Sequence, residues 1–115
     1  MKFQYFTREE FACSETGENE IWDVFVQRLD VLREACGFPF TITSGYRSVK
    51  HSIEAKKQVP GTHTRGIAAD IAVANGKQRR IIVENALEQK FYGIGVAKSF
   101  IHVDIRETDP VMWTY

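Results

Sequence analysis

The side chains best suited to chemistry in this sequence are its three histidines, because two of them lie close in the chain to an aspartate. His63 is followed by Asp70, and His102 is followed by Asp104. Zinc sites in hydrolases typically use three nitrogen or oxygen ligands and leave one position for water. These imidazoles and carboxylates therefore suggest a metal centre, provided that the fold brings them together.

Alternation along two expected strands gives these residues a common face. In the segment 100–106, His102 and Asp104 point to one side, and the apolar residues between them point to the other. In the segment 67–73, Asp70 shares its face with small alanines, which leave room above the sheet for a metal and its substrate. Asp70 is thus expected to meet His102 across the sheet.

His63 lies in the loop that leads into the strand of Asp70, and Gly66 between them permits the backbone to turn back. Alternation alone does not establish a metal centre, because a histidine and an aspartate on a strand face more often belong to a solvated edge or a satisfied hydrogen bond. The remaining histidine, His51, is expected to serve the structure or lie near the substrate, since a fourth protein ligand would close the site to water.

The elements that must position these residues form a pattern typical of an α+β domain with a small sheet. Thr7 and Glu10 form a capping box, which predicts a short helix near 8–13. Apolar spacing predicts helices over 19–36 and 77–90, with Gly37 and Gly93 beyond their ends. β-Branched and aromatic runs predict strands over 40–43, 67–73, 91–96 and 100–105, the last two as a hairpin. Asn75-Gly76 is a turn signal, and a helical turn is expected near 52–58.

The composition fits one domain that recognises its partners locally. The chain has 115 residues and a hydrophobic content of 43%, which is enough for a single core. Fifteen basic and fifteen acidic residues cancel, so no net field attracts nucleic acid or an anionic membrane. No secretory signal pattern opens the sequence, and no apolar run approaches the roughly 20 residues of a membrane span, so the localisation stays open.

The sequence has only two cysteines, Cys13 and Cys36, which is too few for a disulfide scaffold. Their separation also differs from that of a Cys-x-x-Cys metal site. They are expected to be reduced, buried thiols, although two lone cysteines can also pair with each other.

Three motifs resemble those of the zinc D-alanyl-D-alanine peptidases. The segment 63–70 looks like the H-x-x-G-x-A-x-D motif of that family, 100–104 resembles its late strand histidine, and 44–48 is similar to its S-G-Y-R-S loop. The family includes bacterial carboxypeptidases, vancomycin-resistance dipeptidases and phage endolysins, and the Hedgehog signalling domain is a structural relative. The resemblance implies one zinc peptidase domain over 1–115, with a small antiparallel sheet and helices packed on one side.

The resemblance also implies the roles of individual residues. His63, Asp70 and His102 would bind one zinc ion, which lowers the pKa of its bound water toward about 7. Arg47 would hold the substrate carboxylate or polarise the scissile carbonyl, and Ser44 would bind substrate in the same loop. The expected function is hydrolysis of peptidoglycan stem peptides, either as an endolysin-type endopeptidase, in keeping with a phage origin, or as a D,D-carboxypeptidase.

The sequence departs from the pattern of many relatives at the residue that would accept the proton of the zinc-bound water. They carry an acid three positions before the late histidine, where this chain has Ser99. Asp104, on the same strand face as His102, is the candidate base. The alternative is that Asp104 orients a metal ligand, as carboxylates around metal sites often do. A second hypothesis is therefore a catalytically inactive zinc-binding protein of the same fold that binds the cell wall or serves phage assembly.

Overall fold

The computed structural model describes residues 2–51 and 61–115 of the chain. In chain order, the elements are a 3₁₀ helix η1 (Arg8–Phe11), α1 (Asp23–Cys36), β1 (Ile42–Ser44), β2 (Ala68–Ala72), α2 (Gly76–Glu88), β3 (Gly93–Val96), β4 (Phe100–Asp104) and β5 (Val111–Thr114). The turn expected near 52–58 lies outside the described residues. None of the helices in the described part of the chain has the length and apolar character required to cross a membrane.

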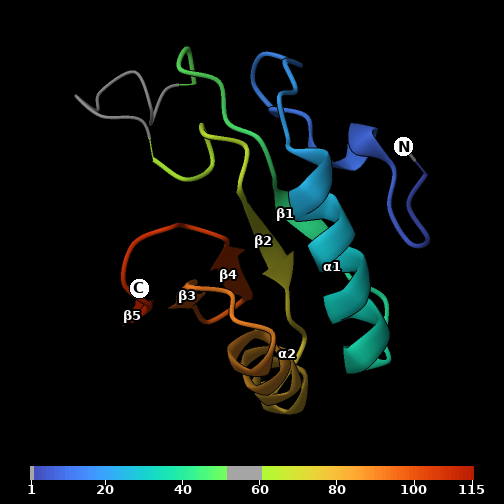
Figure 1. The fold of residues 1–115 in the computed structure, drawn as a ribbon, viewed down its shortest axis with the longest axis vertical. Helices are drawn as coiled ribbons and strands as arrows, with labels where there is room; N and C mark the ends of the chain where they lie inside the picture. The colour runs from blue at the N-terminus through green and yellow to red at the C-terminus, as the bar shows by residue number, and fades with distance from the viewer. Residues whose placement is uncertain (1, 52–60) are drawn as a thin grey trace.

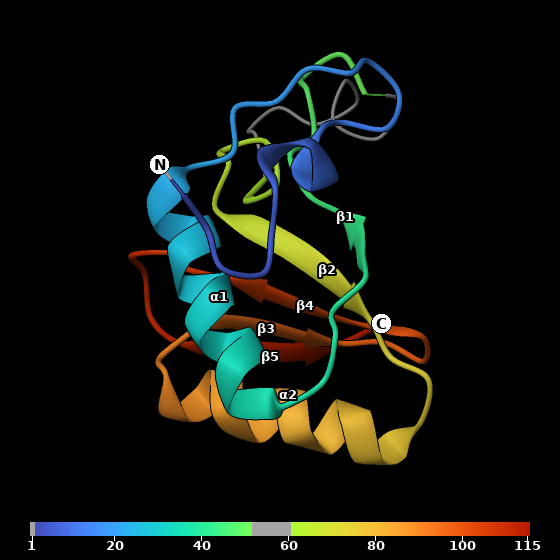
Figure 2. The same ribbon diagram turned by 90° about the vertical axis from the view of Figure 1, so that its right-hand side faces the viewer.

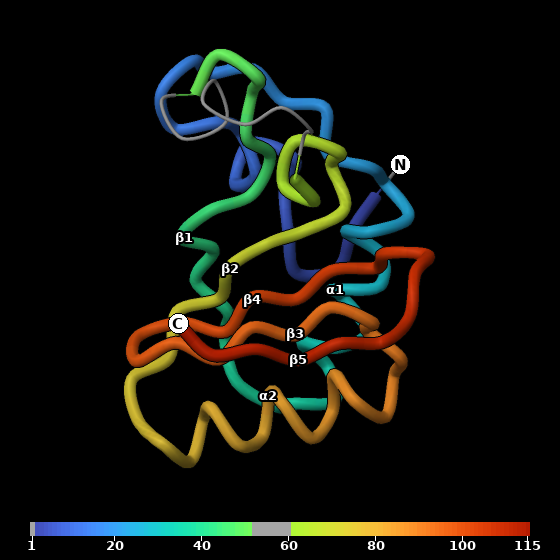
Figure 3. Tube along the Cα trace, turned by 90° about the vertical axis from the view of Figure 1, so that its left-hand side faces the viewer, coloured from blue at the N-terminus to red at the C-terminus, as the bar shows by residue number. Residues whose placement is uncertain are grey.

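The strands form one five-stranded sheet in the order β1-β2-β4-β3-β5, and Figure 3 shows it from the side that the helices leave open. The pairs β1–β2, β2–β4 and β3–β4 are antiparallel, as the sequence predicts, whereas β5 pairs with β3 in parallel. The sequence patterns gave no indication of β5. Most of this short strand is exposed, so it lacks the apolar alternation by which a half-buried strand is recognised.

Both helices pack against the same face of the sheet, which confirms the predicted arrangement (Figures 1 and 2). Leu29 of α1 and Ile82 of α2 belong to one buried cluster with Ile71 of β2 and Ile101 of β4. Because side chains alternate along a strand, the even-numbered residues of β2 and β4 point away from the helices. Cys13 and Cys36 are free and belong to the same buried cluster, in agreement with the reduced form expected.

The first long helix begins later than apolar spacing predicts. The backbone is still extended at Trp22, and α1 starts at Asp23 rather than at residue 19. The amide of Trp22 donates a 2.9 Å hydrogen bond to the Gly66 carbonyl, so this extended segment is held against the loop that carries His63. The helix ends as expected at Gly37, whose φ of 78° is left-handed.

The other two helices also differ at their ends from the boundaries that the sequence predicts. Asn75 is the N-cap of α2, because its side-chain oxygen accepts a 2.9 Å hydrogen bond from the Gln78 amide. Asn75-Gly76 therefore starts the helix instead of forming a turn. After the helix, the residue with positive φ is Lys90, at 62°, and Gly93 lies within β3. The helix expected over 8–13 is shorter, a single 3₁₀ turn in η1.

Candidate metal centre

Asp70 and His102 meet across the sheet as strand alternation predicts. They are direct partners in the β2–β4 ladder. The Oδ1 atom of Asp70 lies 3.2 Å from Nδ1 of His102, and both side chains are buried. The sheet itself therefore fixes two members of the expected metal-binding set.

His63 reaches the same point from the loop before β2. Its Nε2 atom lies 3.3 Å from Oδ1 of Asp70 and 3.2 Å from Nδ1 of His102. The three potential ligand atoms all lie within 4.8 Å of one another. Among the described residues, no other group of histidine, cysteine and carboxylate side chains converges in this way.

A tight turn at Gly66 brings His63 back toward β2. The amide of Gly66 donates a 3.2 Å hydrogen bond to the His63 carbonyl, and the φ of Gly66 is 76°. A Cβ atom at this position would collide with the carbonyl oxygen of Glu20. Gly66 is therefore required both for its left-handed backbone and for the close approach of the segment before α1.

We expect Gly66→Ala to destabilise the protein more than Gly17→Ala. Gly17 has nearly the same φ, 77°, but no neighbouring atom lies within 4 Å of the point where its Cβ would be. Both substitutions carry the left-handed penalty of about 1–2 kcal/mol, and only the first adds overpacking, typically about 1–3 kcal/mol. Chemical denaturation of the two variants measures the difference. Equal losses in the free energy of unfolding would contradict a close approach at Gly66.

Hydrogen bonds from the outer ring nitrogens set the tautomers of both histidines. Nδ1 of His63 lies 2.8 Å from the Gly45 carbonyl oxygen, and Nε2 of His102 lies 2.7 Å from Oδ2 of Asp104. Each of these nitrogens must donate to its acceptor, which leaves the other nitrogen with a lone pair. The two lone pairs and the Asp70 carboxylate face one another, and such a cluster is stable only with a cation or proton between them. The donor set therefore fits a metal ion.

The electrostatics of the centre also favour a cation. Burial raises the pKa of Asp70, but when a proton occupies the space between the three side chains, hydrogen bonds from His102 and His63 outweigh burial and lower that pKa to about 2. Burial lowers the pKa of His102, and its hydrogen bonds to Asp104 and Asp70 outweigh burial and raise it. The surroundings thus favour a positive charge at the point where the three side chains meet.

Asp104 lies on the opposite side of the His102 ring from Asp70 and is fully buried. Its Oδ1 atom accepts hydrogen bonds from the backbone amide and Nε of Arg106, and its Oδ2 atom accepts from Nη2 of Arg106 and from His102. Burial raises the pKa of Asp104, but the Arg106 and His102 hydrogen bonds outweigh it and leave the carboxyl ionised well below its usual range. These contacts favour the orienting role for Asp104, and its role as a base stays a prediction.

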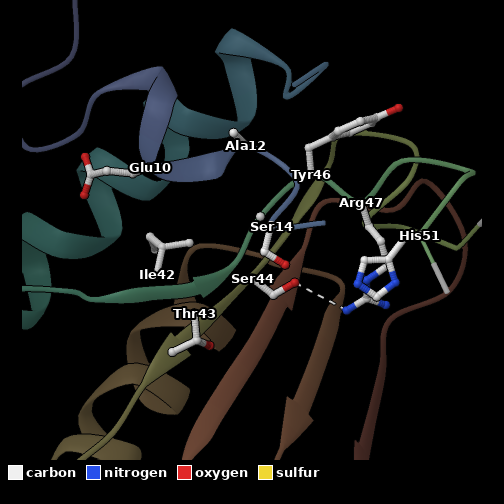
Figure 4. Close-up of a pocket in the computed structure, with 10 residues that line it drawn as sticks. Glu10, Ala12, Ser14, Ile42, Thr43, Ser44, Tyr46, Arg47 and His51 are labelled. Carbon is white, nitrogen blue, oxygen red and sulfur yellow. Dashed lines mark hydrogen bonds between the residues drawn. The ribbon is translucent and has the colours of Figure 1, made fainter. Parts of the chain in front are cut away.

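Arg47 and Ser44 lie next to the centre at the β1 edge of the sheet. Nη2 of Arg47 lies 3.3 Å from the Ser44 hydroxyl oxygen (Figure 4). Ser44 pairs with Asp70 in the β1–β2 ladder, so this loop abuts the strand that carries a metal-ligand candidate. A pocket of about 190 Å³ opens here, lined by Glu10, Ala12, Ser14, Ile42, Thr43, Ser44, Gly45, Tyr46, Arg47 and His51.

The other side chains of the 44–48 loop bind an acidic segment that the sequence patterns did not indicate. The Tyr46 hydroxyl donates to Glu20, and the buried Ser48 hydroxyl donates to Glu18, both at 2.9 Å. These bonds secure the loop. His51 lies 3.0 Å from a carboxylate oxygen of Glu15 and outside the metal-binding group, as expected for the third histidine.

Trp113 of β5 is a further neighbour of the centre that sequence reasoning missed. Its ring lies 5.0 Å from the His102 ring, centroid to centroid. The signal in the sequence was the pair of alternating glycines, Gly93 and Gly95, because glycine inside a strand often marks a close approach by another group. A Cβ atom on Gly95 would come within 2.7 Å of the Trp113 indole nitrogen.

Comparison with known families agrees with the motifs and with the geometry. A family model described as Peptidase M15 matches residues 4–104. The match includes His63, Asp70 and His102 and ends before β5. No curated protein matches the chain. On the extent of the family match, the chain belongs to the Peptidase M15 family of zinc D-alanyl-D-alanine peptidases.

Proposed function

We propose that this protein is a zinc metallopeptidase that hydrolyses peptidoglycan stem peptides, with His63, Asp70 and His102 as the zinc ligands. The observation that carries the proposal is the convergence of these donor atoms within 4.8 Å, in a chain that belongs to a peptidase family. Three nitrogen and oxygen ligands are typical of catalytic zinc, whereas structural sites usually have four protein ligands rich in cysteine.

The protein's own contribution is to hold the ligands in one orientation. Zinc, when bound, supplies Lewis acidity that polarises a peptide carbonyl and makes water acidic enough to attack near neutral pH. The Gly45 carbonyl and the Asp104 carboxylate accept hydrogen bonds from the outer nitrogens of His63 and His102, so the nitrogens that face the metal position are the ones available for coordination. Burial of all three ligands limits competing solvent. Their donor atoms already lie within 4.8 Å of one another, so no large rearrangement is needed when the metal binds.

Arg47 is the residue that we propose to orient the substrate. Its planar guanidinium offers paired donors that suit a peptide carboxylate or a polarised carbonyl. The Ser44 hydroxyl, 3.3 Å away, helps to keep this side chain beside β1. The pocket that both residues line is mostly polar in its side chains, in keeping with a peptide substrate. An endopeptidase and a D,D-carboxypeptidase would use the same groups and differ in the bond presented to the metal.

The test is to purify the chain, measure its zinc content, and incubate it with peptidoglycan and defined muropeptides. We expect about one zinc per chain, and mass spectrometry of the products identifies the bond that is cut. Chelation should abolish cleavage, and added zinc should restore it. A chain that binds no zinc, or that cuts these substrates equally well after complete removal of zinc, would contradict the proposal.

A second candidate is a zinc-binding protein that has lost hydrolysis. It is favoured by one specific observation, the engagement of Asp104 with Arg106 and His102, together with Ser99 at the position where many relatives carry an acid. This candidate predicts stoichiometric zinc and peptidoglycan binding with no peptide product. The same experiment therefore separates the two candidates.

A further inference from the structure

β5 lies outside the segment that the family model matches, which ends at residue 104. Nevertheless, it brings an aromatic side chain to the metal-ligand candidates. The rings of Trp113 and His102 are 5.0 Å apart with an interplanar angle of 52°. The His102 residue is only 3% exposed. Trp113 is therefore part of what excludes solvent from this imidazole.

A glycine in β3 makes room for the indole. Gly95 pairs with His102 on one side and with Trp113 on the other, so the three residues form a row across the sheet. Any side chain at Gly95 would collide with the indole, because a Cβ atom would lie 2.7 Å from its Nε1. The indole thus lies over the backbone of β3, at the level of the His102 ring.

The indole also contacts the charged pair behind His102. The guanidinium carbon of Arg106 lies 5.1 Å from the centroid of the Trp113 ring, within the range of a cation–π interaction. The same guanidinium donates to both oxygens of Asp104, and Asp104 accepts from His102. Trp113 consequently touches both ends of the chain of contacts that runs from His102 through Asp104 to Arg106.

The strand is anchored on both sides of Trp113. The Val111 amide donates to the Tyr92 carbonyl at 2.8 Å, and the Tyr115 amide donates to the Val96 carbonyl at 3.3 Å. The Tyr115 ring packs 5.0 Å from the Phe100 ring of β4. These contacts fix the position of Trp113 along the sheet, so the indole is a preorganised neighbour of His102.

We propose that Trp113 is a positioning residue of the metal centre, acting through His102 and the Arg106–Asp104 pair. It limits rotation of the imidazole and keeps water away from the hydrogen bond between His102 and Asp104, which is stronger in a low-dielectric environment. Zinc affinity therefore depends on a strand outside the matched family segment. This inference rests on the proposed function, because it takes zinc as the bound metal.

The experiment compares zinc dissociation constants of the wild type, Trp113→Ala, Trp113→Phe and Met112→Ala, measured by competition with a chromophoric chelator. We expect Trp113→Ala to weaken zinc binding by about 10–100-fold, the usual effect of losing support around a metal ligand. Trp113→Phe retains a ring and should recover most of the affinity. Met112→Ala should leave the affinity unchanged, because Met112 is on the other face of β5 and 49% exposed.

Gly95→Ala is the second route to the same test, since it displaces the indole without removing it. In the cobalt-substituted protein, the visible absorption bands should shift in Trp113→Ala and in Gly95→Ala, because they report the geometry of the ligands. Circular dichroism identifies variants that fold. If Trp113→Ala or Gly95→Ala folds and binds zinc with wild-type affinity, the inference is overturned while the proposed function stands. A wild type that binds no zinc overturns both.

Discussion

Replacement of His102 by alanine is expected to weaken zinc binding by several orders of magnitude and to abolish peptide hydrolysis. Structural zinc sites in small peptides bind the metal with an apparent free energy of about 10–16 kcal/mol, which sets the scale for this three-ligand centre. Losing one of three ligands should remove roughly a third of it, or about 3–5 kcal/mol, which corresponds to a loss of about 10²–10⁴-fold in affinity. The effect is large because Nδ1 of His102 faces both other ligand candidates.

The matched control for this prediction is His51→Ala. His51 is the histidine outside the metal-binding group, and its imidazole lies against Glu15. Its removal should leave the zinc dissociation constant unchanged. Both variants are measured by chelator competition, with metal content after dialysis as a second readout. If the His102 variant bound zinc as tightly as the His51 variant, the metal centre would have to be assigned to other residues.

Replacement of Asp104 by alanine is expected to destabilise the fold as well as the metal centre. Removing one partner of a buried ion pair typically costs about 3–5 kcal/mol in unfolding free energy. We expect a loss near the lower end, about 3 kcal/mol, because the Arg106 side chain is 23% exposed and can regain water. Urea denaturation measures this loss, with Asp109→Ala as the control because Asp109 is an exposed carboxylate in the same region.

Asp104→Asn distinguishes the two roles considered for this residue. The amide preserves the volume and an acceptor oxygen but removes the charge that supports the His102 tautomer. If Asp104 orients His102, this variant should bind zinc about 10–100-fold more weakly than the wild type. If Asp104 is instead the base, the variant should bind zinc normally and lose kcat alone. The measurements are the zinc dissociation constant and the turnover number at saturating zinc.

The part of the site that could be predicted from the sequence is the part set by strand geometry. Side chains alternate strictly along a strand, so placing Asp70 and His102 on the faces opposite the core required only the apolar residues on either side of them. The structure then makes them direct partners in the β2–β4 ladder, a register that alternation alone does not specify. The role of Gly66 could also be predicted, because a histidine in the loop before β2 can approach that strand only through a sharp turn.

The parts that could not be predicted depend on contacts between distant segments. The Gly45 carbonyl that fixes the tautomer of His63 is a backbone group, and no side-chain pattern indicates where it points. Trp113 lies near His102 because β5 pairs in parallel with β3, and exposed four-residue strands give no periodic signal. Alternation placed Asp104 on the correct face, but its burial depends on Arg106 and on free space over β3.

That free space has an architectural consequence. A sheet covered by helices on one side only normally leaves its other side to solvent, so a buried polar network usually requires a third layer. Here, Gly93 and Gly95 of β3 lack the side chains that would occupy the open side, and the Asp104 carboxylate and the Trp113 indole take their place. The Asp104 carboxylate is thereby fully buried at the depth of the sheet backbone, and a chain of 115 residues encloses this ionic group with only two layers.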